Sequence, residues 1–156
     1  MKTNEYTSVE KCALGYYEVL RGYKGIHVEN EAFHVIYNIL FWDIIYYDKV
    51  KYVFQSPYQT YPLDFYSSDF YENRKEIINK RLLEIESFTD EELSNEIKII
   101  FKNKRNIKTI FVKWDSKLIT EKVIILIACS IKRKILTAIL LEFTKNLKFC
   151  LTGKLH

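Results

Sequence analysis

Residues 30–47 read NEAFHVIYNILFWDIIYY, and this stretch decides the fold. Its apolar residues recur at helical spacing, so it predicts one continuous helix from about Asn30 to Tyr47. The stripe that would face the core consists of Phe33, Ile36, Leu40 and Tyr47, widened by Trp42 and Ile44. An apolar face this broad is typical of a helix that is covered from several sides. We therefore expect this helix to lie inside the domain.

Start signals for further helices lie on both sides of this stretch. Thr7–Glu10 and Thr89–Glu92 match the capping box, in which two side chains satisfy backbone amides at a helix start. Ser68 is the expected cap of a helix that runs to about Glu86. Two more helices are predicted near residues 120–130 and 131–147. With 4 Gly and 2 Pro among 156 residues, the chain is predicted to form one domain without a long linker.

The remaining segments are less regular. Residues 50–66 contain both prolines and predict an aromatic-rich loop packed on the core. Residues 107–114, IKTIFVKW, are β-branched and aromatic, so they predict a short strand. The fold class predicted from the residues is therefore mainly α, with at most one or two short strands.

A histidine and a carboxylate precede the long helix, in Gly25-Ile26-His27-Val28-Glu29-Asn30. A carboxylate near a helix N-terminus is stabilised by a few tenths of a kcal/mol through the helix dipole. Local spacing alone favours this capping role for Glu29 over a catalytic one, and the role of His27 is open. The sequence contains no glycine-rich phosphate loop, nucleophile motif or His/Cys metal cluster. The residues themselves leave two roles open for Glu29, a helix cap or a metal ligand.

Charge is distributed unevenly along the chain, whose net charge is +4. Residues 98–156 carry 14 Lys and Arg against 3 Asp and Glu, whereas residues 1–97 carry 10 against 17. A basic half beside an acidic half suggests a polyanion partner such as nucleic acid. The alternative is a solvated, lysine-rich surface without a partner.

The last predicted helix carries a cluster of these basic residues. Lys134, Lys145 and Lys148 fall within about 60° of one another at helical pitch, and Lys132 and Arg133 precede them. The opposite, apolar side is expected to consist of Ile135, Leu136, Ile139, Phe143 and Leu147.

Disulfide-rich and membrane classes are not indicated. The three cysteines, Cys12, Cys129 and Cys150, are odd in number and widely spaced, so they form neither a disulfide framework nor a CxxC pair. The most apolar segment, residues 123–141, is interrupted by Lys132-Arg133-Lys134, so it is too short to span a bilayer. The first residues are polar and show no secretory signal. We expect a chain that does not associate with membranes.

Four short motifs follow one another along the chain. They are Gly-Ile-His-x-Glu at Gly25–Glu29, Leu-x-Trp-Asp-Ile-Ile at Leu40–Ile45, an aromatic-Pro-Leu-Asp turn at Tyr61–Tyr66, and Phe-Tyr-x-x-Arg at Phe70–Arg74. Lys113-Trp114-Asp115 matches a further Trp-Asp element. In this order and combination they resemble the Fanconi-associated nuclease family, over about residues 9–153.

The resemblance implies a nuclease domain of the virus-type replication–repair (VRR-NUC) kind, which is similar to restriction endonucleases. This chain would be the helical portion of that α/β domain. The implied chemistry is phosphodiester hydrolysis, in which carboxylates hold Mg²⁺ or Mn²⁺. Glu29 matches the family's upstream glutamate, so it is implied as a metal ligand and catalytic residue. His27 is expected to orient the loop by hydrogen bonding rather than to bind metal.

The resemblance also implies DNA as the partner, in branched or flap structures. The family cuts 5′ flaps and trims 5′ ends in the nucleus, during repair of interstrand cross-links. Lys148 matches a basic residue that could contact a DNA phosphate, and Lys132, Arg133, Lys134 and Lys145 are expected to extend that surface. A ubiquitinated repair-complex partner would be reached through family regions absent from this chain.

The sequence departs from the family pattern near its end. The family continues through Gly-x-Pro-Asp to a strand with Glu-x-Lys; here Gly153 matches the glycine, but Leu155 and His156 stand where Pro and Asp would be. Residues 1–156 are thus interpreted as a partial nuclease domain. Since a single carboxylate does not hold Mg²⁺, we expect this chain alone to be inactive. The alternatives are a non-catalytic helical module, a degenerate paralogue that binds nucleic acid or a protein, and a structural remnant without function.

Overall fold

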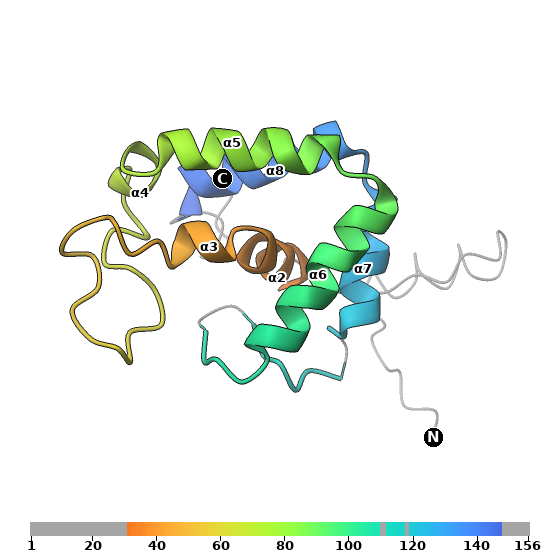
Figure 1. Cartoon of the computed structure of the whole chain (residues 1–156), viewed down its shortest axis with the longest axis horizontal. Helices are drawn as coiled ribbons and strands as arrows, with labels where there is room; N and C mark the ends of the chain where they lie inside the picture. Colours follow the sequence, from red (N-terminus) through yellow and green to blue (C-terminus); the bar gives the residue numbers. More distant parts are fainter. Residues whose placement is uncertain (1–30, 110–111, 118, 148–156) are drawn as a thin grey trace, which may run out of the picture. The chain divides into compact units, whose positions relative to one another are not determined.

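The structure, a computed structural model, describes residues 31–109, 112–117 and 119–147. These residues form seven helices, shown in Figure 1. In chain order they are α2 (Glu31–Leu40), α3 (Trp42–Ile45), α4 (Asp69–Glu72), α5 (Lys75–Ser87), α6 (Asp90–Lys104), α7 (Glu121–Ser130) and α8 (Arg133–Lys145). None of the described residues belongs to a strand. The predicted mainly α fold class is confirmed for this part of the chain.

Helix α2 lies between the other helices. Helix α5 packs along α8, α6 packs along α7, and α2 contacts both α6 and α7 (Figure 1). Seven of the ten residues of α2 are buried, in agreement with the broad apolar stripe of the sequence. Each fully buried Ile or Leu side chain contributes about 1.5–3 kcal/mol relative to an exposed one. The packing of α2 is therefore a large part of the core.

The predicted continuous helix over residues 30–47 is wrong, because it is interrupted at Phe41 (φ −107°, ψ 17°). In a continuous helix the Leu40 carbonyl would accept a hydrogen bond from the Ile44 amide. Instead, Ile44 donates to the Phe41 carbonyl at 3.0 Å, and the Leu40 carbonyl accepts from Arg81 Nε at 2.9 Å. A side chain from α5 has replaced one backbone bond of the helix.

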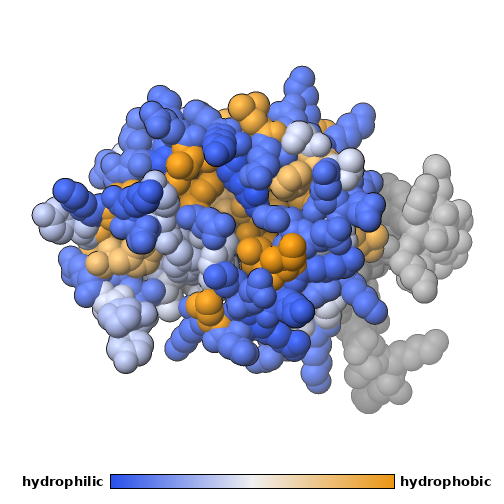
Figure 2. All heavy atoms as spheres, in the orientation of Figure 1, coloured by the Kyte–Doolittle hydropathy of each residue, from blue (hydrophilic) through white to orange (hydrophobic). Residues whose placement is uncertain are grey.

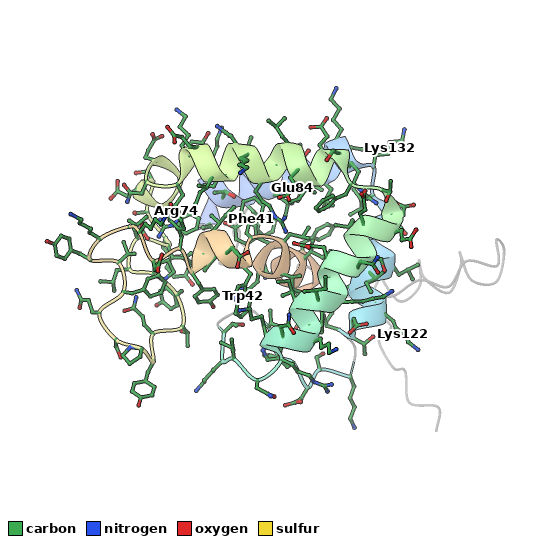
Figure 3. The ribbon with its side chains drawn as sticks, in the orientation of Figure 1. Phe41, Trp42, Arg74, Glu84, Lys122 and Lys132 are labelled. Atoms are coloured by element: carbon green, nitrogen blue, oxygen red, sulfur yellow. The ribbon has the colours of Figure 1, made fainter. Side chains whose placement is uncertain are left out.

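The predicted helix over residues 68–86 is also divided, into α4 and α5, with Arg74 (φ −127°, ψ 10°) preceding α5. The Arg74 side chain is fully buried and forms a forked ion pair with Asp64. Nη1 lies 2.7 Å from Oδ2, and Nη2 lies 3.2 Å from Oδ1. Nε donates to the Ile44 carbonyl at 3.1 Å, and the guanidinium lies over the Phe70 ring at 4.4 Å. Figure 3 shows Arg74 between α4, α5 and the loop that contains Asp64.

Two helix starts show which capping predictions are correct. The capping box at Thr89 and Glu92 is confirmed: the Glu92 amide donates to Thr89 Oγ1, and the Thr89 amide donates to Glu92 Oε2 at 2.8 Å. The Thr89 hydrogen bonds lower the pKa of the Glu92 carboxyl. Ser68 does not cap α4; the Asp69 amide donates to Ser67 Oγ at 3.2 Å instead. The box at Thr7–Glu10 lies outside the described residues.

The aromatic-rich loop that follows α3 packs on the core, as predicted. Val53 and Phe65 are buried. The Tyr46 hydroxyl donates to the Thr60 carbonyl at 2.9 Å, and burial raises the pKa of Tyr46 to about 12. The Gln59 amide crosses the loop by donating to the Val53 and Tyr61 carbonyls. These bonds order the loop that contains Asp64, the partner of Arg74.

The strand predicted over residues 107–114 is not found among the described residues 107–109 and 112–114, while residues 110 and 111 lie outside the described part. The Ile107 amide donates to the Lys104 carbonyl at 2.8 Å, which forms a turn after α6. Trp114 Nε1 donates to the Ile107 carbonyl at 2.8 Å. That carbonyl is thus used by an indole across the loop rather than by a neighbouring strand.

Replacing Asp64 with alanine should lower the free energy of unfolding by about 3–5 kcal/mol, because it leaves the buried Arg74 charge without its partner. Urea denaturation followed by circular dichroism measures this loss. The matched control is Asp48→Ala, which removes an exposed carboxylate from the same loop and should change the free energy by less than about 0.5 kcal/mol. Equal effects of the two substitutions would contradict the role of the ion pair.

Candidate nucleic-acid interface

The predicted metal ligand lies outside the described part of the chain. Glu29, His27 and Lys148 are not among the described residues, so Glu29 as ligand and His27 as loop-orienting residue stay predictions. Within residues 31–109, 112–117 and 119–147, no three His, Cys, Asp or Glu side chains are grouped so that they could hold a metal ion. The described residues therefore do not fit a Mg²⁺ or Mn²⁺ site by themselves, and no catalytic step follows from them.

The predicted lysines of α8 lie on its exposed side. Lys134 is in the first turn and Lys145 in the last, and both are exposed. Eleven residues separate them, so they lie on the same side of the helix, about 16 Å apart along its axis. Lys145 Nζ lies 5.3 Å from the centre of the Tyr71 ring, and Lys132, just before α8, is exposed. We call Lys132, Lys134 and Lys145 the α8 lysines.

Helix α8 is turned slightly from its predicted orientation. Ile135 was expected on the apolar side but is 53% exposed. The buried residues of the helix are Leu136, Thr137, Leu140 and Thr144. Lys134 lines a shallow groove between α5 and α8 together with Leu83, which is 70% exposed. The surface around Lys134 is therefore less purely basic than the sequence predicted.

Arg133 has a different position from its lysine neighbours. Its side chain is mostly buried, and Nε donates to the Phe88 carbonyl at 3.2 Å. Nη1 donates to the Ala128 and Ile131 carbonyls, and Nη2 pairs with the Asp90 carboxylate. The guanidinium thus joins the end of α5, the start of α6 and the end of α7. Its donors are thus used within the fold, and the contact with DNA that the sequence predicted for Arg133 stays a prediction.

A second basic region was missed by sequence reasoning. Residues 98–122 carry eight Lys and Arg against two Asp and Glu. The count of charges in this window is a signal that was present in the sequence. Its significance depends on the fold, which brings the end of α6 beside the start of α7. Figure 2 shows hydrophilic residues over most of one face, with hydrophobic residues in small separate patches.

The motif residues gather around Arg74. Arg74 ends the Phe70–Arg74 motif, and its partner Asp64 belongs to the Tyr61–Tyr66 motif. The carbonyl that accepts from its Nε belongs to Ile44, in the Leu40–Ile45 motif. Three segments that are separate in the sequence therefore meet at one guanidinium.

The chain was also compared with curated proteins and with protein-family models. No protein-family model matches the chain. The Fanconi-associated nuclease 1 of Danio rerio is 32% identical over 146 residues, which is 94% of this chain and 15% of that protein. A Fanconi-associated nuclease 1 homolog of Dictyostelium discoideum is 46% identical over 79 residues, 51% of this chain and 7% of that protein. The human Fanconi-associated nuclease 1 is 31% identical over 113 residues, 72% of this chain and 11% of that protein.

This chain belongs to the Fanconi-associated nuclease family. It spans 7–15% of the length of the curated relatives that it matches, so it corresponds to a small segment of each. The Danio rerio match leaves ten residues of the chain outside it, so it covers residues 11–146 wherever it begins. Glu29, Asp64 and Arg74 all lie within this family segment. No helix among the described residues is long and apolar enough to cross a membrane.

Replacing the α8 lysines with glutamine should weaken binding of the chain to duplex DNA. Each phosphate contact contributes a slope of about −0.9 in log affinity against log salt, so three lost contacts should reduce the slope by about 2.7. Fluorescence anisotropy with labelled duplex at several salt concentrations measures both quantities. The matched control replaces Lys49, Lys51 and Lys80, three exposed lysines elsewhere, with glutamine. Identical slopes for the two triple variants would mean that the α8 lysines are only a solvated surface.

Proposed function

We propose that this chain is the helical part of a structure-specific, metal-dependent DNA nuclease. In this proposal the complete domain cuts 5′ flaps and trims 5′ ends of branched DNA, in the nucleus, during repair of interstrand cross-links. The observation that carries the proposal is the match to a named nuclease over at least residues 11–146. The buried Arg74–Asp64 pair supports it, since it joins three motifs of the family into one folded unit.

The proposed role of Glu29 is to provide one carboxylate ligand to Mg²⁺ or Mn²⁺. When bound, such an ion polarises the scissile phosphate and activates the attacking water. Magnesium usually takes one or two carboxylates together with substrate oxygens and water, so Glu29 requires further oxygen ligands. The α8 lysines would hold DNA phosphates by charge, which positions the strand without reading its sequence.

The second candidate function is a non-catalytic helical module that binds nucleic acid. The exposed lysines at α8 favour it, because they need no metal to attract a phosphate backbone. The two candidates differ in one measurable respect. The first requires Glu29 for metal binding and cleavage, whereas the second makes Glu29 a helix cap.

A chimera tests the nuclease proposal. Residues 11–146 of this chain replace the matching segment of the Danio rerio relative, and the protein is given a labelled 5′-flap DNA with Mn²⁺. We expect cleavage by the chimera. In the same background Glu29→Gln should reduce the cleavage rate by about 100-fold or more, because losing a metal ligand removes several kcal/mol of transition-state stabilisation. Mn²⁺ affinity, measured by calorimetry, should fall with it.

The control for this experiment is Glu31→Gln, which changes an exposed glutamate two residues further along the chain, at the start of α2. It should leave cleavage and metal affinity as they are in the chimera. If Glu29→Gln behaves like Glu31→Gln, Glu29 is a cap and not a ligand. A folded chimera that binds flap DNA but never cleaves it would favour the non-catalytic module.

A further inference from the structure

A groove of about 880 Å³ lies between the end of α6 and the start of α7. Its floor is apolar and aromatic: Phe101 and Ile119 are 8% and 5% exposed, and Trp114 is half-buried. Figure 3 shows Lys122 at the start of α7, and Lys122 lines the groove together with Lys102 and Arg105 from the end of α6. None of the α8 lysines is among the residues that line this groove.

The rims of the groove are basic on both sides. Lys98, Lys102 and Arg105 follow one another on α6 at intervals of four and three residues, so they lie on one side of that helix. Lys122, in the first turn of α7, lines the same groove, and all four are exposed. Two acidic residues, Asp115 and Glu121, also line the groove. Within the part of the chain that the structure describes, none of the four cations forms an ion pair with a carboxylate.

The aromatic floor is fixed in place before any ligand arrives. Trp114 Nε1 donates to the Ile107 carbonyl at 2.8 Å, which sets the plane of the indole. Its ring lies edge-on to Phe101, with centroids 5.3 Å apart, and 6.3 Å from the ring of Trp42. A base can stack on such a ring whatever its identity, because every base has a π-face.

We propose that this groove binds a segment of single-stranded nucleic acid. The phosphates would lie against Lys98, Lys102, Arg105 and Lys122, and a base would lie against the Trp114 ring. A basic groove with an aromatic floor is the arrangement by which proteins hold single strands without sequence preference. A duplex fits less well, because its bases are stacked inside and cannot reach a recessed ring.

This surface is distinct from the one used in the proposed nuclease function. Lys122 and Lys132 lie at opposite ends of α7, which is about 15 Å long (Figure 3). The inference concerns binding alone and does not depend on metal, on Glu29 or on cleavage. The two surfaces can therefore be tested in separate variants of one chain.

The first test measures the affinity of the full chain for a labelled oligothymidylate by fluorescence anisotropy over a range of salt. The groove variant carries Lys98→Gln, Lys102→Gln, Arg105→Gln and Lys122→Gln. It should bind the strand about tenfold or more weakly, and its salt slope should fall by up to about 2.8, since each contact with a single strand contributes about −0.7. The control with the same charge change replaces Lys49, Lys51, Lys75 and Lys80, which are exposed elsewhere.

The second test uses the intrinsic fluorescence of Trp114. The chain has two tryptophans, so in a Trp42→Phe variant only Trp114 reports. Oligothymidylate should quench this signal by stacking, whereas inorganic polyphosphate, which has no bases, should not. A Trp114→Phe variant, which keeps an aromatic ring in the floor, should lose the quenching seen in the parent chain. If Trp42→Phe fails to fold, the comparison of Trp114→Phe with the parent chain still shows whether Trp114 is quenched by the strand.

The inference is overturned by equal affinity of the groove variant and its control for the strand, or by Trp114 fluorescence that the strand leaves unchanged. It is overturned equally if the chain binds duplex more tightly than strand through these four residues. Loss of strand binding only in the α8 lysine variant also overturns it, while leaving the proposed nuclease function intact. Conversely, if the chimera does not cleave DNA but the groove binds the strand, the proposed nuclease function is rejected and the binding site in the groove is supported.

Discussion

A buried guanidinium is the constraint on which this fold depends. Removing the Arg74 charge from water costs several kcal/mol unless its donors are satisfied in good geometry. Asp64 satisfies two of its nitrogens, and the Ile44 and Phe70 carbonyls accept the remaining bonds given by the structure. These partners come from α3, from the aromatic loop and from α4. Satisfying one side chain therefore fixes where three segments end, and these segments carry three of the motifs that resemble the family.

Among the described residues, most arginines join segments within the fold, whereas the lysines lie at the surface. Arg81 completes the end of α2 through the Leu40 carbonyl and pairs with Glu84 and Glu96, and Arg133 completes the ends of α5 and α7. A planar fork with five donors suits such junctions, where carbonyls and a carboxylate lie in different directions. Lysine, a point charge on a flexible stem, stays at the surface. The cations free to meet phosphate are consequently lysines, with Arg105 the exception in the groove.

The sequence predicted correctly those features that depend on residues close together in the chain. The capping box at Thr89 depends on four consecutive residues, and the burial of α2 depends on its own apolar stripe. The interruptions at Phe41 and Arg74 could not be predicted in this way, because Arg81 and Arg74 reach carbonyls 41 and 30 residues away. The strand predicted from the β-branched composition of residues 107–114 is not found at the described residues 107–109 and 112–114, where the Ile107 carbonyl accepts from the Trp114 indole. The burial predicted for Ile135 is wrong for the same reason, because exposure is decided by the neighbouring helix and not by the helix that carries the residue.

The two basic surfaces differ in the same way, because one lies along a single helix and the other is assembled from several segments. The α8 lysines were visible in the sequence since they lie on one helix, whereas the groove needs residues from α6, α7 and the loop between them. Helix α7 sets the separation of the two surfaces, because it packs against α6 along its length and Arg133 fixes its end. If both surfaces bind as proposed, a duplex arm on α8 and a single strand in the groove would be held about one helix length apart. A branched DNA offers both kinds of arm at one junction, whereas a uniform duplex offers only the first. Discrimination between them would then arise from the spacing of the two surfaces along α7, without any contact that reads a base.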